Sequence, residues 1–267
     1  MSAWQQLSPS EYLRLPLGTA FGLTDTGTVR PSNQDNFLVA QDLNLAAVAD
    51  GMGGHQAGDV ASAEALRLVA DYLRLHRLQP DPDATWTGPC AAARELLAAA
   101  IAHANDTIYG INAAGGRSDG TGMGTTLTGI WQPAPEAPLL AFHIGDTRLY
   151  RWRNGQLAQL TRDQTMYQQA LDLGAPEPLP PRNLLLQAVG PSPGIEPELH
   201  ASPVQAGDLY LLCSDGLHGP TSDAAIAAVL AAARPETLHI ACAELVAQAK
   251  RDGSRDNITA VLLYCPA

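Results

Sequence analysis

Residues 36–54, NFLVAQDLNLAAVADGMGG, contain the pattern that decides most of the fold. Two short apolar runs, 36–40 and 43–49, flank a polar pair, which is typical of two β-strands joined by a tight turn. The second run ends in Asp50, and a glycine-rich turn follows it. The stretch therefore predicts a β-hairpin that carries a carboxylate at the end of its second strand.

The rest of the chain alternates between helical and extended patterns. Residues 58–77 and 90–109 repeat apolar side chains at helical spacing, and a segment rich in proline and aspartate at 79–89 separates them. Asn154-Gly155 lies between two strand-like halves and is a strong hairpin signal. We predict further strands at 125–131, 139–144, 209–213 and 258–264, helices at 166–174, 223–233 and 235–250, and a glycine-rich loop at 115–124.

Hairpins dominate over regular alternation of strand and helix. The sheets should therefore be largely antiparallel, and an α+β layered fold with helices covering the sheet faces is expected. Residues 1–20 show little periodicity and are predicted to form a loosely attached N-terminal arm. No internal repeat or linker divides residues 21–267, so this range is predicted to be a single domain.

The composition narrows the class of protein. The 267 residues include 16 basic and 27 acidic side chains, a formal charge of −11, which argues against nucleic-acid binding because such proteins need a basic surface. Bound cations would still allow an anionic substrate. No apolar run of roughly 20 residues and no signal-peptide pattern occurs, so no membrane association is expected. The four cysteines are widely spaced, which suits a reducing cytoplasm.

Four aspartates occur at the ends of predicted strands. Asp50, Asp146 and Asp215 each follow an apolar run, and Asp256 precedes the last one. In antiparallel sheets these positions can share one edge, where crowded carboxylates repel one another unless a cation neutralises them. An all-oxygen cluster favours Mg²⁺ or Mn²⁺ over zinc. A single Asp-Gly pair is more often a turn, but four acids in equivalent places favour a metal site.

Two residues just before the first hairpin add to this pattern. Arg30 can bind phosphate oxygens in a bidentate manner beside a metal pair, and Asp35 can orient metal-bound water. Taken alone, Arg30 is more simply an exposed arginine on a turn, and Asp35 a turn acid. Together with the aspartates they point to chemistry on phosphate groups.

These residues belong to motifs that resemble the bacterial PPM (PP2C-type) family of metal-dependent protein phosphatases. The resemblance covers residues 20–264, and six motifs occur in the family's order. They are Arg30-Pro-Ser-Asn-Gln-Asp35, VADGMGG at 48–54, Gly124-Thr125-Thr126, Gly145-Asp146-Thr147-Arg148-Leu149-Tyr150, Ser214-Asp215-Gly216-Leu217 and Asp256-Asn257-Ile258-Thr259.

The resemblance implies a fold and a set of roles. The fold is a four-layer sandwich of two antiparallel sheets flanked by helix pairs. Asp50 is expected to bridge two Mn²⁺ or Mg²⁺ ions, Asp215 and Asp256 to complete the first ion's shell, and the Gly51 carbonyl to bind the second. Asp146 matches a ligand of a third, weaker ion. The implied roles of Arg30 and Asp35 are to bind the substrate phosphate and to hold metal-bound water.

The implied reaction is hydrolysis of phosphoserine and phosphothreonine on proteins by a metal-bridged hydroxide, opposing a bacterial serine/threonine kinase. Phosphorylated protein substrates, including that kinase and its targets, are the expected partners of a monomer. Two alternatives remain open. One is a catalytically weak homologue that binds phosphorylated partners, and the other is a two-metal nuclease, which the acidic composition disfavours.

Three departures from the family pattern affect these expectations. Met52 occupies a position where some relatives have a histidine that protonates the leaving alcohol; His55 is a nearby substitute, though more simply a loop residue. Residues 184–190, LLLQAVG, lack an arginine that the family often has there. Residues 163–183 are proline-rich and belong to the variable flap, here spanning 163–190. The substrate preference is therefore open.

Overall fold

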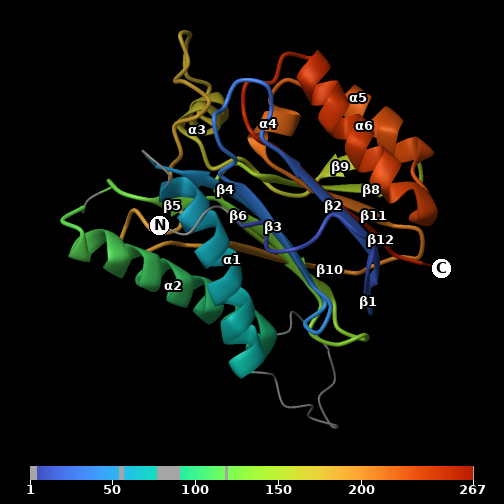
Figure 1. The fold of residues 1–267 in the computed structure, drawn as a ribbon, viewed down its shortest axis with the longest axis horizontal. Coiled ribbons are helices and arrows are strands. Elements are labelled where there is room, and N and C mark those ends of the chain that lie inside the picture. Colours follow the sequence, from blue (N-terminus) through green and yellow to red (C-terminus); the bar gives the residue numbers. More distant parts are fainter. Residues whose placement is uncertain (1–4, 54–56, 77–90, 118–119, 267) are drawn as a thin grey trace.

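Two antiparallel β-sheets pack face to face in the computed structural model, which describes residues 5–53, 57–76, 91–117 and 120–266 (Figure 1). One sheet has the order β1 (Leu13–Leu15), β2 (Gly18–Asp25), β12 (Ile258–Tyr264), β11 (Leu209–Cys213), β8 (Arg148–Arg153) and β9 (Gln156–Gln159). The other has the order β10 (Glu198–Ser202), β7 (Leu139–Ile144), β6 (Leu127–Trp131), β4 (Leu45–Met52) and β3 (Asp35–Ala40), with β5 (Gly124–Thr125) beside β4.

Helices cover the two outer faces. The second sheet is covered by α1 (Ala57–Leu75) and α2 (Ala91–Ala114), and the first by α5 (Asp223–Ala232) and α6 (Leu238–Arg251) (Figure 1). A 3₁₀ turn, Pro235–Thr237, leads into α6, and the short helix α4 (Asp215–His218) follows β11. The expected four-layer α+β sandwich with flanking helix pairs is confirmed.

The alternation of side chains along each strand builds three separate cores. In β4, Ala46 and Val48 face the other sheet and pack with residues such as Tyr210, whereas Ala47 and Ala49 face the helices. Successive side chains of a strand point to opposite faces of the sheet, and both faces of β4 are covered. Almost every residue of this strand is therefore apolar. The sandwich thereby holds the ends of its strands in fixed positions.

The tight turns follow the sequence signals. Asn154 and Gly155 both have positive φ, 51° and 78°, and join β8 to β9. Two such residues form the turn that matches the twist of a hairpin, so the predicted hairpin is confirmed. Asn44 also has a positive φ, 58°, and lies in the turn that joins β3 to β4.

The prediction of a loosely attached arm over 1–20 is wrong for residues 13–20. This segment forms β1 and the start of β2, and Leu13, Leu15 and Leu17 are at most 8% exposed. Leucines at alternate positions carried a strand signal that was too short to recognise. Strand β10 was also not predicted, because its residues are largely accessible and lack an apolar run. Segment 79–89 lies outside the described residues.

No single described helix is long and apolar enough to span a bilayer. Helix α5 and residues 235–251 reach the necessary length and apolar content only as a pair bent by 115°.

Candidate active site

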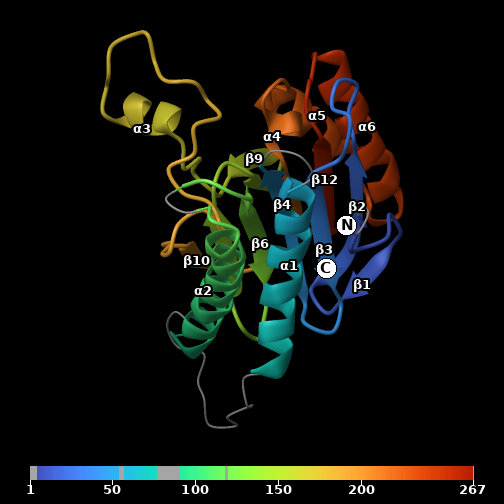
Figure 2. The ribbon, with the colours of Figure 1, turned by 60° about the vertical axis from the view of Figure 1, so that its left-hand side comes forward.

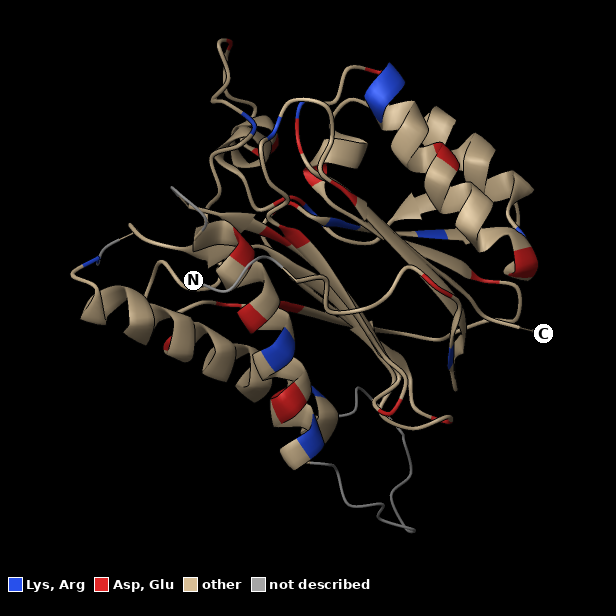
Figure 3. Ribbon diagram, in the orientation of Figure 1, with Lys and Arg blue, Asp and Glu red and all other residues tan. Residues whose placement is uncertain are grey.

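The candidate site forms where the strands of both sheets end together. Asp35 at the start of β3 is directly opposite Asp50 in β4, and Cys213 at the end of β11 is opposite Ala260 in β12. The second pairing brings Asp215, just after β11, next to the segment before β12. Acidic residues accordingly gather at this end of the sandwich in Figure 3. The antiparallel register is thus the reason that acids distant in sequence meet.

Asp35 joins the two sheets at this edge. It is 1% exposed, and its Oδ2 accepts hydrogen bonds from Ser214 Oγ at 2.6 Å and from Thr259 Oγ1 at 2.7 Å. Ser214 precedes the predicted ligand Asp215, so these bonds also fix the position of that ligand. The pKa of Asp35 is raised to about 7, chiefly because the carboxyl group is buried. The two hydrogen bonds lower this pKa in part, and the negative charge of Asp215 raises it further.

Burial, together with crowding, raises the pKa of Asp50, Asp215 and Asp146 as well. The pKa of Asp50 is well above its ordinary value, because of burial first and then the charges of Asp35 and Asp215. Burial and the charge of Asp256 raise the pKa of Asp215. Burial and the charge of Asp215 raise that of Asp146 to about 8. Repulsion among these carboxylates therefore favours the binding of a cation that neutralises them.

Arg30 contacts this cluster from the loop before β3. Its Nη2 donates to Asp256 Oδ2 at 2.5 Å, and this contact raises the pKa of the guanidinium. The loop is held by Asn257, whose Oδ1 accepts from Gln34 N at 2.8 Å and whose Nδ2 donates to Thr26 O and Ser32 O, both at 2.9 Å. Asn257 therefore positions the segment that carries Arg30.

Asp146 lies on the connection between β7 and β8, next to the flap. His218 Nε2 is 2.9 Å from the Asp146 carbonyl oxygen, and burial lowers the pKa of His218 to about 3, so its imidazole is neutral. Two residues further on, Arg148 forms a bidentate pair with Asp163 at the flap's first residue, with both distances 2.7 Å. Arg148 thus anchors the base of the flap beside the acid cluster.

The donor set suits a hard divalent cation. All of the side-chain donors are carboxylate oxygens, and Asp215 Oδ1 is buried with no hydrogen-bond partner among the described residues. Within the same residues, no three acidic, histidine or cysteine side chains already form a ligand set for an ion. The Asp256 carboxylate is instead directed to Arg30. Ion binding therefore requires these carboxylates to turn toward a common point.

The glycine and methionine that follow Asp50 are held at the entrance to α1. A Cβ on Gly51 would lie 2.0 Å from the Gly58 carbonyl oxygen, so no side chain fits there. Met52 is paired with Gly124, and its thioether carries no proton to donate. His55 lies outside the described residues.

Two pockets meet at Asp215. One, of about 570 Å³, is lined in part by Arg30, Asp256 and the exposed Arg255, and the other, of about 300 Å³, in part by Asp146 and Arg182. Asp215 contributes to both. The acid cluster is thus accessible from two sides.

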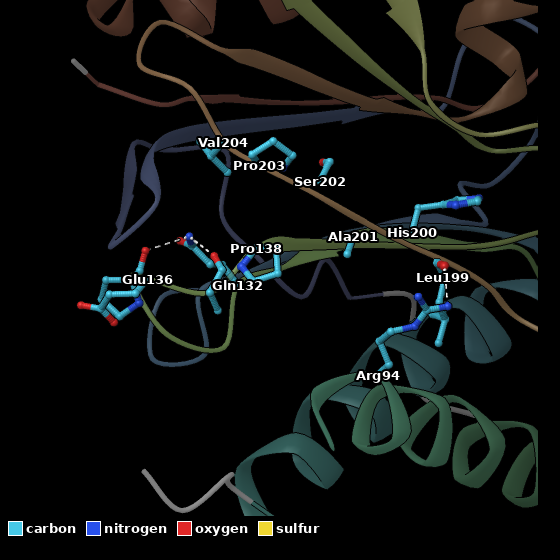
Figure 4. Close-up of a pocket in the computed structure, with 12 residues that line it drawn as sticks. Arg94, Gln132, Glu136, Pro138, Leu199, His200, Ala201, Ser202, Pro203 and Val204 are labelled. Atoms are coloured by element: carbon cyan, nitrogen blue, oxygen red, sulfur yellow. Dashed lines mark hydrogen bonds between the residues drawn. The ribbon is translucent and has the colours of Figure 1, made fainter. Parts of the chain in front are cut away.

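A larger pocket, of about 850 Å³, lies along β10 and is remote from this cluster in the sheet order (Figure 4). Arg94 crosses toward it from α2 and donates to the Leu199 carbonyl oxygen at 3.1 Å. Of the described residues that line it, only Glu136 is acidic. Charge and buried carboxylates, rather than size, therefore identify the candidate active site.

Several residues that organise the site were not singled out from the sequence. Ser214, Thr259, Asn257 and Arg148 all lie inside the motifs quoted above, within three residues of a candidate acid. Their position next to the acids was the available signal. Their roles depend on partners far away in the chain, which the motifs do not reveal.

Comparison with known proteins connects this geometry to a family. Residues 29–257 match the family model of protein phosphatase 2C. The chain is 37% identical over 246 residues to the serine/threonine protein phosphatase PstP of Mycobacterium tuberculosis, covering 90% of this chain but only 43% of that protein. It is 33% identical over 250 residues to the serine/threonine phosphatase stp of Listeria innocua, covering 90% and 93% of the two chains.

The folds agree as well. The crystal structure of the catalytic domain of PstP in complex with two manganese ions superposes with a TM-score of 0.74 at 34% identity, covering 93% of this chain and 98% of that one.

Proposed function

Because the chain belongs to the protein phosphatase 2C family, we propose that it hydrolyses phosphoserine and phosphothreonine on proteins. The observation that carries this proposal is the convergence of Asp35, Asp50, Asp215 and Asp256 beside Arg30 at one edge of the sandwich. The raised pKa values of Asp35, Asp50 and Asp215, next to the Arg30 guanidinium, suit a site that binds cations that in turn bind phosphate.

The proposed ligands of two core ions, Mn²⁺ or Mg²⁺, are Asp50, Asp215, Asp256 and the Gly51 carbonyl. A third and weaker ion is proposed at Asp146. The raised pKa values and the unpartnered Asp215 Oδ1 support this assignment. When bound, such ions supply an activated water and neutralise phosphate charge.

The chain's own residues position the substrate. Arg30 would exchange its contact with Asp256 for the phosphate oxygens, which its planar guanidinium can bind in pairs. Asp35, held by Ser214 and Thr259, is placed to accept a hydrogen bond and would orient water at the ions.

The proposed cellular setting is the cytoplasm. A serine/threonine kinase and its targets are the proposed partners, and the proposed form is a monomer. The described cysteines, Cys213, Cys242 and Cys265, are free and buried, which supports a reducing cytoplasm.

The test is hydrolysis of a phosphothreonine peptide with Mn²⁺, with and without EDTA. We expect turnover that EDTA abolishes and excess Mn²⁺ restores, and its loss in Asp215→Asn. Glu11→Gln removes an exposed acid and is the matched control, with wild-type turnover expected. A folded wild-type protein that binds the peptide without metal-dependent turnover would overturn the proposal and favour a phosphoprotein-binding role.

A phosphodiester substrate run in parallel addresses the nuclease alternative. The acidic composition predicts no cleavage of it.

A further inference from the structure

A pocket of about 300 Å³ separates the acid cluster from the flap. Asp146 and Asp215 contribute from the sandwich, and Tyr167 and Arg182 contribute from the flap. Figure 2 shows the flap and its helix α3 (Met166–Asp172) projecting away from the rest of the sandwich. A peptide whose phosphate lies over the acid cluster therefore has the flap residues beside its neighbouring side chains.

Arg182 and Tyr167 support each other. The guanidinium carbon lies 4.0 Å from the centroid of the Tyr167 ring, and Arg182 Nη2 donates to the Tyr167 hydroxyl at 2.8 Å. Stacking and the hydrogen bond together restrict an exposed side chain that would otherwise sample many rotamers. The pair thus presents a guanidinium in a defined orientation.

Hydrogen bonds at the base of the flap fix the positions of Tyr167 and Arg182 relative to each other. Met166 N donates to Leu184 O, and Leu186 N donates to Gln164 O, both at 2.8 Å. The Thr165 hydroxyl caps α3 by accepting from Gln168 N at 3.1 Å. Tyr167 and Arg182 therefore lie on two segments that are bonded to each other, close to the point where Arg148 anchors the flap.

The two arginines in this pocket differ in how many of their N–H groups already bind other residues of the protein. Arg148 donates to Asp163 through Nε and Nη2 and to the Tyr150 hydroxyl through Nη1, so it is fully engaged. Arg182 forms no ion pair with any carboxylate in the described part of the chain. Its remaining N–H groups, and the hydrogen of the Tyr167 hydroxyl, are donors that face solvent and are available to an anionic group.

We propose that Arg182 and Tyr167 form a specificity subsite for an anionic group adjacent to the phosphorylated residue of the substrate. The chemistry recognised is that of an oxyanion: the carboxylate of an aspartate or glutamate, or a second phosphate. A guanidinium fork with a neighbouring hydroxyl matches either group in a charge-assisted, bidentate manner. This inference rests on the proposed phosphatase function, because it concerns the same cleft.

The test uses a set of phosphothreonine peptides whose five positions on each side of the phosphothreonine are glutamine. Each position in turn is changed to glutamate, and kcat/KM is compared with that of the all-glutamine peptide. Charge-assisted bonds at an exposed site predict a gain of about fivefold to tenfold at one or two positions. The gain should appear in KM and diminish with added salt.

Variants of Arg182 and Tyr167 show whether the preference for glutamate comes from this pair or from the overall charge of the protein. In Arg182→Gln the ratio between the glutamate and glutamine peptides should fall to about one, and in Tyr167→Phe, which keeps the stacking but loses the hydroxyl, it should fall partway. Arg14→Gln removes an exposed arginine from β1, at the edge of the first sheet farthest from β9, and should keep the full ratio. A ratio that survives in Arg182→Gln would overturn the proposal.

A second arm distinguishes the two sources of the oxyanion. Phosphothreonine replaces glutamate at the preferred position, and mass spectrometry follows the loss of each phosphate. A larger gain than with glutamate indicates that doubly phosphorylated segments are preferred, and an equal gain indicates an acidic side chain; both support the subsite. Hydrolysis of all peptides at equal rates would overturn the subsite alone, whereas no hydrolysis of any peptide would overturn the phosphatase function itself.

Discussion

Replacing Asp146 by asparagine should change how the stability of the metal-free protein depends on pH. Burial, followed by repulsion from Asp215, raises the pKa of Asp146 from 3.8 to about 8 in the folded state. Between about pH 6 and 7.5 the unfolded chain has released this proton, whereas the folded protein keeps it. The unfolded state then binds fewer protons, so stability falls as pH rises. The asparagine variant lacks this contribution.

The size of the effect follows from these two pKa values. Linkage predicts that Asp146 lowers the unfolding free energy by about 2 kcal/mol between about pH 6 and 7.5. For a domain of this size that corresponds to about 4–8 °C in melting temperature. His218, whose pKa is lowered, acts in the opposite direction, but mainly below its ordinary value of 6.5. Comparing wild type with the variant removes the contribution of groups outside the acid cluster.

The assay is thermal unfolding in EDTA at several pH values, with Glu11→Gln as a control that should follow the wild type. Between pH 6 and 7.5 the melting temperature of wild type should fall further than that of Asp146→Asn by the amount given above. Saturating Mn²⁺ should shrink this difference, because cations bind the ionised carboxylate. Parallel pH profiles in EDTA would refute the reasoning and remove the electrostatic argument for a cation site at Asp146.

Two further substitutions probe residues that organise the site. Asp163→Asn removes the carboxylate, only 13% exposed, that pairs with Arg148 in a bidentate manner. The unfolding free energy measured by urea titration should fall by about 3–5 kcal/mol. A loss below about 1 kcal/mol would contradict a structural role for the pair. Asn257→Ala removes three hydrogen bonds to the loop that carries Arg30 and should cost about 2–4 kcal/mol while raising KM for a phosphopeptide. An unchanged KM would show that Asn257 does not position Arg30.

Much of the fold was predictable because its signals are local. The hairpin at Asn154-Gly155 depends on two adjacent residues that tolerate positive φ, and β3 and β4 depend on uninterrupted apolar runs. Strands β1 and β10 escaped prediction for the opposite reason. Residues 13–15 are too few for a periodic pattern, and β10 is stabilised by its pairing with β7 rather than by an apolar run.

The candidate site shows a similar division. The placement of Asp50 and Asp215 after apolar runs was visible in the sequence, although β4 continues past Asp50 to Met52, and so was the preference of such acids for hard cations. The sequence did not show that Arg30 contacts Asp256, 226 residues away, or that Asp35 binds Ser214 and Thr259 across the two sheets.

The sequence by itself determined most of the segments that become strands and helices and which apolar runs are followed by a carboxylate, because alternation, turn residues and apolar runs act within a few residues. Only the tertiary structure decided which carboxylates share an edge, how far their mutual repulsion and burial raise their pKa values, and that Arg182 stacks on Tyr167 beside them. Those outcomes depend on strand register and on packing between segments distant in the chain, and both are set by the fold as a whole.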